Sequence, residues 1–219
     1  MQFFRVLWWR LRYALWYLQW RVMFWSAEWR TVHGIKVGVF GVWEDQVLKR
    51  AFEKIDTALG LIAIHEPRRL QRATRDMRRL WIWRAAYSSA YYLQTWQMCV
   101  IDLKFLTDDQ TSAAKAAAVL VHEATHARLF NCGIRYTEKA RLRIKSICVA
   151  ESASFSRRLP DGEALARHVE ACQPSNESHW SDQNLDHRML QARLQEMDEA
   201  PLPSWLKRLL RRVLLSRAA

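Results

Sequence analysis

The chain has 219 residues, of which 50% are hydrophobic and 26% are charged, and it contains six glycines and five prolines. This composition excludes a disordered, collagen-like or low-complexity protein, and the length allows one domain with appendages or two small domains. The formal net charge is +12, from 34 Lys and Arg against 22 Asp and Glu, so anionic surfaces are candidate partners.

The cysteines argue for a reduced protein. They have no Cys-x-x-Cys spacing, and two of them lie inside apolar runs. We therefore expect all four to be reduced core residues of a cytoplasmic protein. They are Cys99, Cys132, Cys148 and Cys172.

Residues 1–30 differ in composition from the middle of the chain. They hold five arginines, one glutamate and six of the twelve tryptophans. The arginines interrupt every hydrophobic run, so we expect neither a signal peptide nor a membrane span there. The segment is interpreted as a helical appendage with two apolar faces, lying between its own core and a lipid or protein surface.

The middle of the chain, residues 31–200, opens with short elements. Alternating apolar residues predict a strand at 35–40. A helix is predicted at 43–59, with Gly60 as its stop. The short apolar run 61–64 is then a strand candidate.

Pro67 is expected to open a helix that is rich in arginine. The run 68–84 holds seven arginines and ends beside two tryptophans, a combination that could bind nucleic acid. No groove-reading or stacking motif accompanies it, so we favour a solvated helix face. The apolar side of this helix would be Leu70, Ala73, Met77 and Leu80.

The second half of the chain is predicted to be helical. The strongest strand pattern spans 97–106, and every later segment has helical periodicity. Strands followed by helices indicate an α+β fold, with a small mixed sheet and a helical half. The predicted helices span about 112–131, 137–159, 161–172 and 184–199.

The helix at 112–131 carries the motif His-Glu-x-x-His. His122 and His126 are four residues apart, so their imidazoles lie on one face of a helix and can bind one metal ion. Glu123 is about 100° round the helix, where it can reach a metal-activated water without being a ligand. The spacing therefore predicts a Zn²⁺ site with a general base.

A third ligand is expected from the helix at 137–159. Glu151 is centred on an apolar stripe that includes Ile144 and Cys148, and a carboxylate there is costly to bury unless a cation or metal meets it. We predict that Glu151 completes the zinc site. The alternative is an ion pair with Arg158, two turns later on the same side.

Residues 201–219 form a second appendage. Pro201 and Pro203 separate it from the preceding helix, and its helical wheel divides into an apolar face and a basic face. Such a helix fits an anionic membrane surface, a partner groove or its own domain. The apolar face would be Trp205, Leu206, Leu209, Leu210 and Val213, and the basic face Lys207, Arg208, Arg211 and Arg212.

The motif at 122–126 with Glu151 on the next helix resembles the zincin superfamily of zinc metallopeptidases, in its gluzincin arrangement. The metzincin arrangement is disfavoured, because Leu129 and Cys132 stand where that family has Gly and His. The resemblance covers about residues 97–160. It implies a zincin-like fold, a sheet edge at the strand 98–106 with a peptide or protein substrate extended along it, and Glu123 as the general base.

The resemblance also implies a second group that stabilises the oxyanion. Nothing in the sequence selects it among several candidates. These are Tyr136, Arg158, His168, His179 and His187.

Our expectation from the sequence is a cytoplasmic zinc metallopeptidase, resting on the inner membrane face through residues 1–30 and 201–219. One alternative is a membrane-surface or protein-interaction protein with a structural zincin unit. The other is a nucleic-acid-binding module that uses the 68–84 run. Fold and metal alone do not fix the substrate, so both alternatives stay open.

Overall fold

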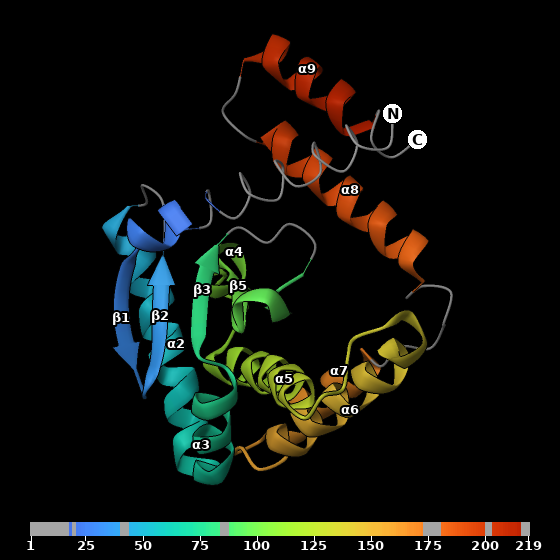
Figure 1. The fold of residues 1–219 in the computed structure, drawn as a ribbon. Helices are drawn as coiled ribbons and strands as arrows, with labels where there is room; N and C mark the ends of the chain where they lie inside the picture. Colours follow the sequence, from blue (N-terminus) through green and yellow to red (C-terminus); the bar gives the residue numbers. More distant parts are fainter. Residues whose placement is uncertain are drawn as a thin grey trace.

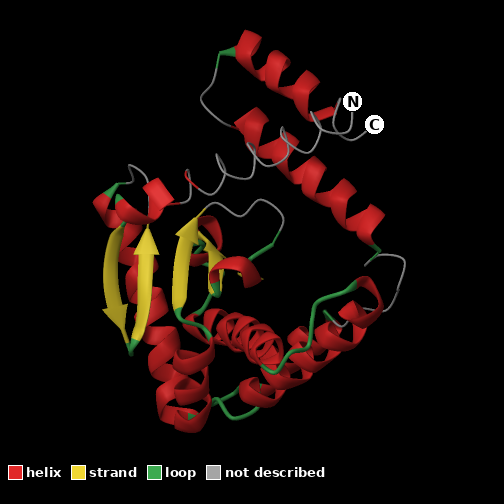
Figure 2. Cartoon of the chain, viewed as in Figure 1, coloured by secondary structure: helices red, strands yellow, loops and turns green. Residues whose placement is uncertain are grey.

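A five-stranded sheet and the helices packed on one of its faces form the body of the protein (Figures 1 and 2). The fold is mixed α+β and rich in helix, as the order of strand and helix patterns predicted. The computed structural model describes residues 18, 21–39, 44–83, 88–172, 181–199 and 203–215.

The sheet is mixed and has the strand order β1-β2-β3-β5-β4. Its two outer pairs are antiparallel and its two inner pairs are parallel. β4 is therefore an edge strand, and β5 lies one strand inside it. This corrects the expectation that the strand at 98–106 forms the edge. The strands are β1 (Glu28–Val32), β2 (Ile35–Val39), β3 (Arg79–Trp83), β4 (Ala90–Leu93) and β5 (Met98–Asp102).

The helices follow the predicted order in the second half of the chain. Each of the helices expected there is present to within a few residues. The helices are α2 (Asp45–His65), α3 (Pro67–Asp76), α4 (Leu103–Thr107), α5 (Ala113–Asn131), α6 (Glu138–Ser156), α7 (Glu163–Ala171), α8 (Asp182–Glu199) and α9 (Ser204–Leu215).

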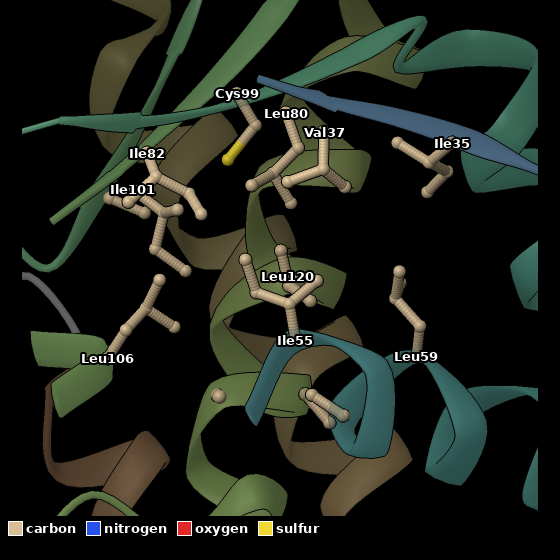
Figure 3. Packing of buried hydrophobic residues seen from close by; sticks show 14 of the residues in the cluster. Ile35, Val37, Ile55, Leu59, Leu80, Ile82, Cys99, Ile101, Leu106 and Leu120 are labelled. Atoms are coloured by element: carbon tan, nitrogen blue, oxygen red, sulfur yellow. The ribbon is translucent and has the colours of Figure 1, made fainter. Parts of the chain in front are cut away.

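The main core lies between the sheet and the helices α2 and α5. Alternate residues of β2, such as Val37, point to this side together with Leu80 of β3 and Cys99 of β5 (Figure 3). They meet Ile55 of α2 and Leu120 of α5. Burial of these side chains holds α5 against the sheet and thereby sets the position of the His-Glu-x-x-His motif.

The opposite face of the sheet carries a second, aromatic cluster. Trp81, Met98 and Val100 are fully buried there, and Phe24 and Trp29 pack against them. The rings of Trp29 and Trp81 have centroids 5.5 Å apart, in the range of favourable aromatic pairs. The two faces of the sheet thus have different chemistry.

Helix α2 is longer than the span predicted for it, 43–59. α2 continues through Gly60 and includes residues 61–64, which the sequence analysis assigned to a strand. Leu59 and Ile62 lie on the same buried face of this helix, so burial against the sheet outweighs the cost of one helical glycine, about 1 kcal/mol.

The arginine-rich run is not a single helix face. α3 begins at Pro67 as predicted, but it ends at Asp76, and Leu80 belongs to β3. Across this boundary four apolar residues happen to have the spacing of one helix face. They are Leu70, Ala73, Met77 and Leu80. The signal for β3 was the uninterrupted apolar run of residues 80–83.

Two further strand boundaries have local causes. β1 pairs with β2 through a two-residue turn at His33 and Gly34, whose φ angles are +46° and +83°, as a tight hairpin of this twist requires. β5 ends at Asp102, whose side chain accepts a hydrogen bond from the Phe105 backbone N–H and caps α4. The predicted strand 97–106 is therefore too long.

The ends of the chain are only partly described. The predicted boundary between residues 30 and 31 falls inside β1, so the sheet includes part of the expected appendage. α8 leads away from α6 toward α9 (Figure 1). α9 packs on α8, where Lys207 and Arg211 both contact Asp198.

All four cysteines are free thiols, two of them buried and two exposed. Cys99 and Cys148 are buried, as expected. Cys132 and Cys172 are exposed at the ends of α5 and α7, so their assignment to the core is wrong. Within the described ranges, no helix is long and apolar enough to cross a lipid bilayer.

Gly38 and Gly60 give a matched test of this fold. A Cβ at Gly38 would lie 2.7–2.9 Å from the ring of Trp29, whereas one at Gly60 would meet its nearest atom at 3.7 Å. We expect Gly38→Ala to lower the free energy of unfolding by about 1–3 kcal/mol. Gly60→Ala should raise it by about 0.5–1 kcal/mol. Urea denaturation measures both changes, and a neutral Gly38→Ala would contradict the close packing of Trp29.

Candidate metal centre

Helix α5 presents the two histidines side by side. Ser112 caps its start by accepting a hydrogen bond from the Lys115 N–H, and Gly133, with φ of +82°, follows its end. Four residues span just over one helical turn, so the rings of His122 and His126 lie on one face. Their centroids are 5.1 Å apart.

Helix α6 lies against this face in a definite register. The Ser152 hydroxyl donates a buried hydrogen bond of 2.6 Å to the Ala118 carbonyl. The two helices run in opposite directions through a short loop. Cys148 lies four residues before Ser152 and His122 four residues after Ala118, so the register brings Cys148 level with His122.

His122, His126 and Cys148 form a group that could hold a metal ion. Each offers one ligand atom, and these three atoms all lie within 4.8 Å of one another. Two imidazole nitrogens and one thiolate are donors that Zn²⁺ accepts, at about 2.0–2.3 Å. The donor chemistry of this group is thus compatible with zinc.

Glu151, the third ligand predicted from the sequence, lies elsewhere. It is three residues beyond Cys148, or about 4.5 Å further along the helix axis, away from the level of His122. Its carboxylate pairs with the guanidinium of Arg69 from α3. Glu151 is therefore not a member of the group that the structure brings together.

Arg69 is the centre of a network that accounts for the carboxylate on the apolar stripe of α6. Besides Glu151 it binds Glu66, at 2.8 Å, and Glu66 also forms an ion pair with Arg158 at 3.0 Å. An ion pair between Glu151 and Arg158 was the alternative expected from the sequence. Glu151 does pair with a cation, but that cation is Arg69 of α3.

Burial controls the charge of the ligand atoms. It lowers the pKa of both histidines, to about 3 for His126, and the positive charge of Lys145 acts in the same direction. Both imidazoles are therefore neutral at pH 7, which is the form that binds metals. Burial also raises the pKa of the Cys148 thiol, so metal binding there would release a proton.

Glu123 is buried beneath the edge strand. Burial raises its pKa to about 7, and the charge of Lys145 and a hydrogen bond from the Tyr92 backbone N–H partly oppose this rise. Tyr92 belongs to β4, so the carboxylate lies between the histidine face of α5 and the edge of the sheet. A carboxylate with a pKa near neutral pH can both accept and return a proton.

Tyr136 is the one sequence candidate for a second group that contacts the histidines directly in the described chain. Its ring meets that of His126 edge to face, with centroids 5.4 Å apart. The Arg141 guanidinium also packs on the Tyr136 ring, 5.2 Å from its centroid. Arg141 is buried and pairs with Asp182, so the start of α8 supports Tyr136 indirectly.

The remaining candidates are not brought to this group. Arg158 binds Glu66, and His168 and His187 are exposed on α7 and α8, with no described contact to the histidine pair. His179 lies outside the described residues.

Two residues of the centre were not expected from the sequence: Cys148 as a donor and Lys145 as a nearby charge. The available signal was that Cys148 precedes Glu151 by one turn in the same stripe.

Comparisons of the chain with protein-family models, with curated proteins and with solved structures found no match.

Arg69 should be important for stability, because it serves two partly buried carboxylates. We expect Arg69→Met to lower the free energy of unfolding by about 3 kcal/mol, since Glu66 and Glu151 lose their shared cation. The matched control is Arg68→Met, an exposed neighbour on α3, with an expected change within about 0.5 kcal/mol. Urea denaturation compares the two. Equal small effects would contradict the network.

Proposed function

We propose that the chain is a zinc-dependent peptidase of the zincin type. In this proposal His122, His126 and Cys148 hold the ion, and Glu123 is the general base. The observation that carries it is the three ligand atoms within 4.8 Å of one another beside a buried glutamate on the same helix. Three protein ligands leave a fourth position open, which is typical of catalytic rather than structural zinc.

The zinc ion, when bound, would lower the pKa of a water to about 7 and polarise the carbonyl of the scissile bond. Glu123 then takes the proton of the attacking water and passes it to the leaving amine. The Tyr92 N–H holds the Glu123 carboxylate in place during this transfer. Tyr136, whose ring contacts His126, and Lys145, whose charge acts on both histidines, could stabilise developing negative charge.

The substrate in this proposal is an extended peptide. β4 is an edge strand of the sheet, and α5 packs against it. Such an edge offers backbone groups to which a peptide can add as a further strand. The hydrogen bond between Tyr92 and Glu123 joins this edge to the base, so a peptide on β4 would pass close to the ligand atoms.

Two alternatives are less well supported. A nucleic-acid site along 68–84 would need one continuous face of cations with a ring for stacking on bases. The exposed Arg68 and Arg79 lie on different elements, α3 and β3, and Trp81 is fully buried. A structural zinc site would not need a buried carboxylate beside the histidines. A structural role of the zinc can be distinguished by experiment, because such a protein would bind zinc without cleaving peptides.

The metal content of the purified protein tests the ligand set. We expect one zinc per chain in the wild type and in Glu151→Gln, and a loss of affinity of more than about 100-fold in His126→Ala and Cys148→Ser. Replacement of zinc by cobalt should give a thiolate charge-transfer absorption that disappears in Cys148→Ser. The elemental analysis should include copper, because two His and one Cys also suit that metal.

The opposite pattern would contradict this ligand set. If Glu151→Gln lost the ion while Cys148→Ser kept it, the third ligand would be Glu151. If all four proteins held no metal after reconstitution, the proposal of a zinc enzyme would fail.

Glu123→Gln tests the chemistry. Glutamine keeps the acceptor for the Tyr92 N–H and is neutral, so we expect a folded, zinc-loaded protein whose kcat is lower by about 10²–10⁴-fold. The assay is the cleavage of a quenched fluorescent peptide library by the zinc-loaded protein. Glu163→Gln, at the exposed start of α7, is the matched control and should cleave like the wild type.

A wild type that binds zinc but cleaves no peptide would favour the structural alternative. Full activity in Glu123→Gln would exclude Glu123 as the base.

A further inference from the structure

The face of the sheet opposite the metal centre carries a cavity of about 840 Å³. Four of its lining residues are basic and none is acidic. Its floor is the aromatic cluster, in which Phe24 and Trp29 stack with centroids 5.8 Å apart. Most of its lining comes from the described helix 21–25, from β1 and from the neighbouring strands β2 and β3.

The positive charge of this cavity has little internal compensation. Lys36 of β2 and Arg79 of β3 are paired in register on neighbouring strands, and both are exposed. Among the described side chains, no carboxylate forms an ion pair with Arg21, Lys36 or Arg79. Adjacent like charges repel one another, so an anion placed between them would be stabilised.

An exposed apolar stripe adjoins the basic residues. Val22 and Trp25 are three residues apart on the described helix 21–25, so they share one side, and Leu18 precedes Val22 by four residues in the sequence. Leu18, Val22 and Trp25 are 57%, 54% and 92% exposed. Val22 and Trp25 also line the cavity beside Arg21. An exposed apolar stripe next to exposed cations marks an interaction surface.

We propose that this cavity and stripe bind the surface of an anionic phospholipid membrane. Lipid phosphates would occupy the space among Arg21, Lys36 and Arg79, while Leu18, Val22 and Trp25 enter the boundary between headgroups and acyl chains. The aliphatic members of the stripe favour lipid over nucleic acid, because stacking on bases needs aromatic faces. Phe24 and Trp29 already use their rings within the aromatic cluster.

Vesicle binding by the full chain tests this proposal. The wild type should bind vesicles of equimolar phosphatidylcholine and phosphatidylglycerol at about 0.1 M salt, and not vesicles of phosphatidylcholine alone. The triple variant Arg21→Gln, Lys36→Gln, Arg79→Gln should bind on the order of 100-fold more weakly, at about fivefold per charge removed. Trp25→Ser keeps the charge and should also weaken binding.

The matched control is a triple variant of exposed basic residues on other helices, Arg68→Gln, Lys139→Gln and Arg143→Gln. It has the same net charge as the cavity variant and should bind vesicles like the wild type. α9 is unchanged in every variant, so any binding through its basic face contributes equally. Thermal melting and zinc content, measured on each variant, show whether the chain remains folded.

Several results would overturn the proposal. One is equal weakening by the two triple variants, which would mean that only net charge matters. Another is binding of a uridine-rich single-stranded RNA that is lost in the cavity variant while vesicle binding is kept. A third is complete displacement of the protein from vesicles by millimolar inorganic phosphate, which would mean that the cavity takes the free ion.

Discussion

The hydrogen bond from the Ser152 hydroxyl to the Ala118 carbonyl is the contact on which the candidate metal centre depends. It is buried, so its loss would leave a polar group without a partner between two helices. It sets the antiparallel register of α5 and α6, and this register brings Cys148 level with His122. A shift of one turn would bring Glu151 there instead. The identity of the third donor is therefore a property of helix packing rather than of the motif.

The same packing buries both histidines and Glu123, and this burial explains their protonation states. Burial lowers the pKa of His122 and His126 and raises that of Glu123 to about 7. The carboxylate of Glu151 forms an ion pair with Arg69 of α3. Neutral imidazoles beside a buried acid are a state in which a cation would be strongly stabilised, because it replaces the solvation that both lost on folding.

The sheet separates this chemistry from a second surface. Its residues alternate between the aliphatic core, which supports α5, and the aromatic cluster on the other face. Gly38 allows Trp29 to lie flat on that second face. The exposed cations Lys36 and Arg79 lie on this same face. The sheet thus places the candidate metal centre on one side and the proposed lipid-binding cavity on the other, and the two sites share no described side chain.

The sequence by itself determined the elements whose signals are local. These include β2, α5 with its histidine pair, the later helices and the α+β order, because hydrophobic periodicity and capping residues act within a few positions. Tertiary structure decided the rest. Burial carried α2 through Gly60, sheet pairing turned residues 79–83 into β3, and β4 rather than β5 became the edge. Cys148 and Glu151 are equivalent in one dimension, since both lie on one stripe of α6. Only the packing of α6 on α5 and of Arg69 on Glu151 distinguishes them, and such distant contacts leave no periodic trace in a sequence.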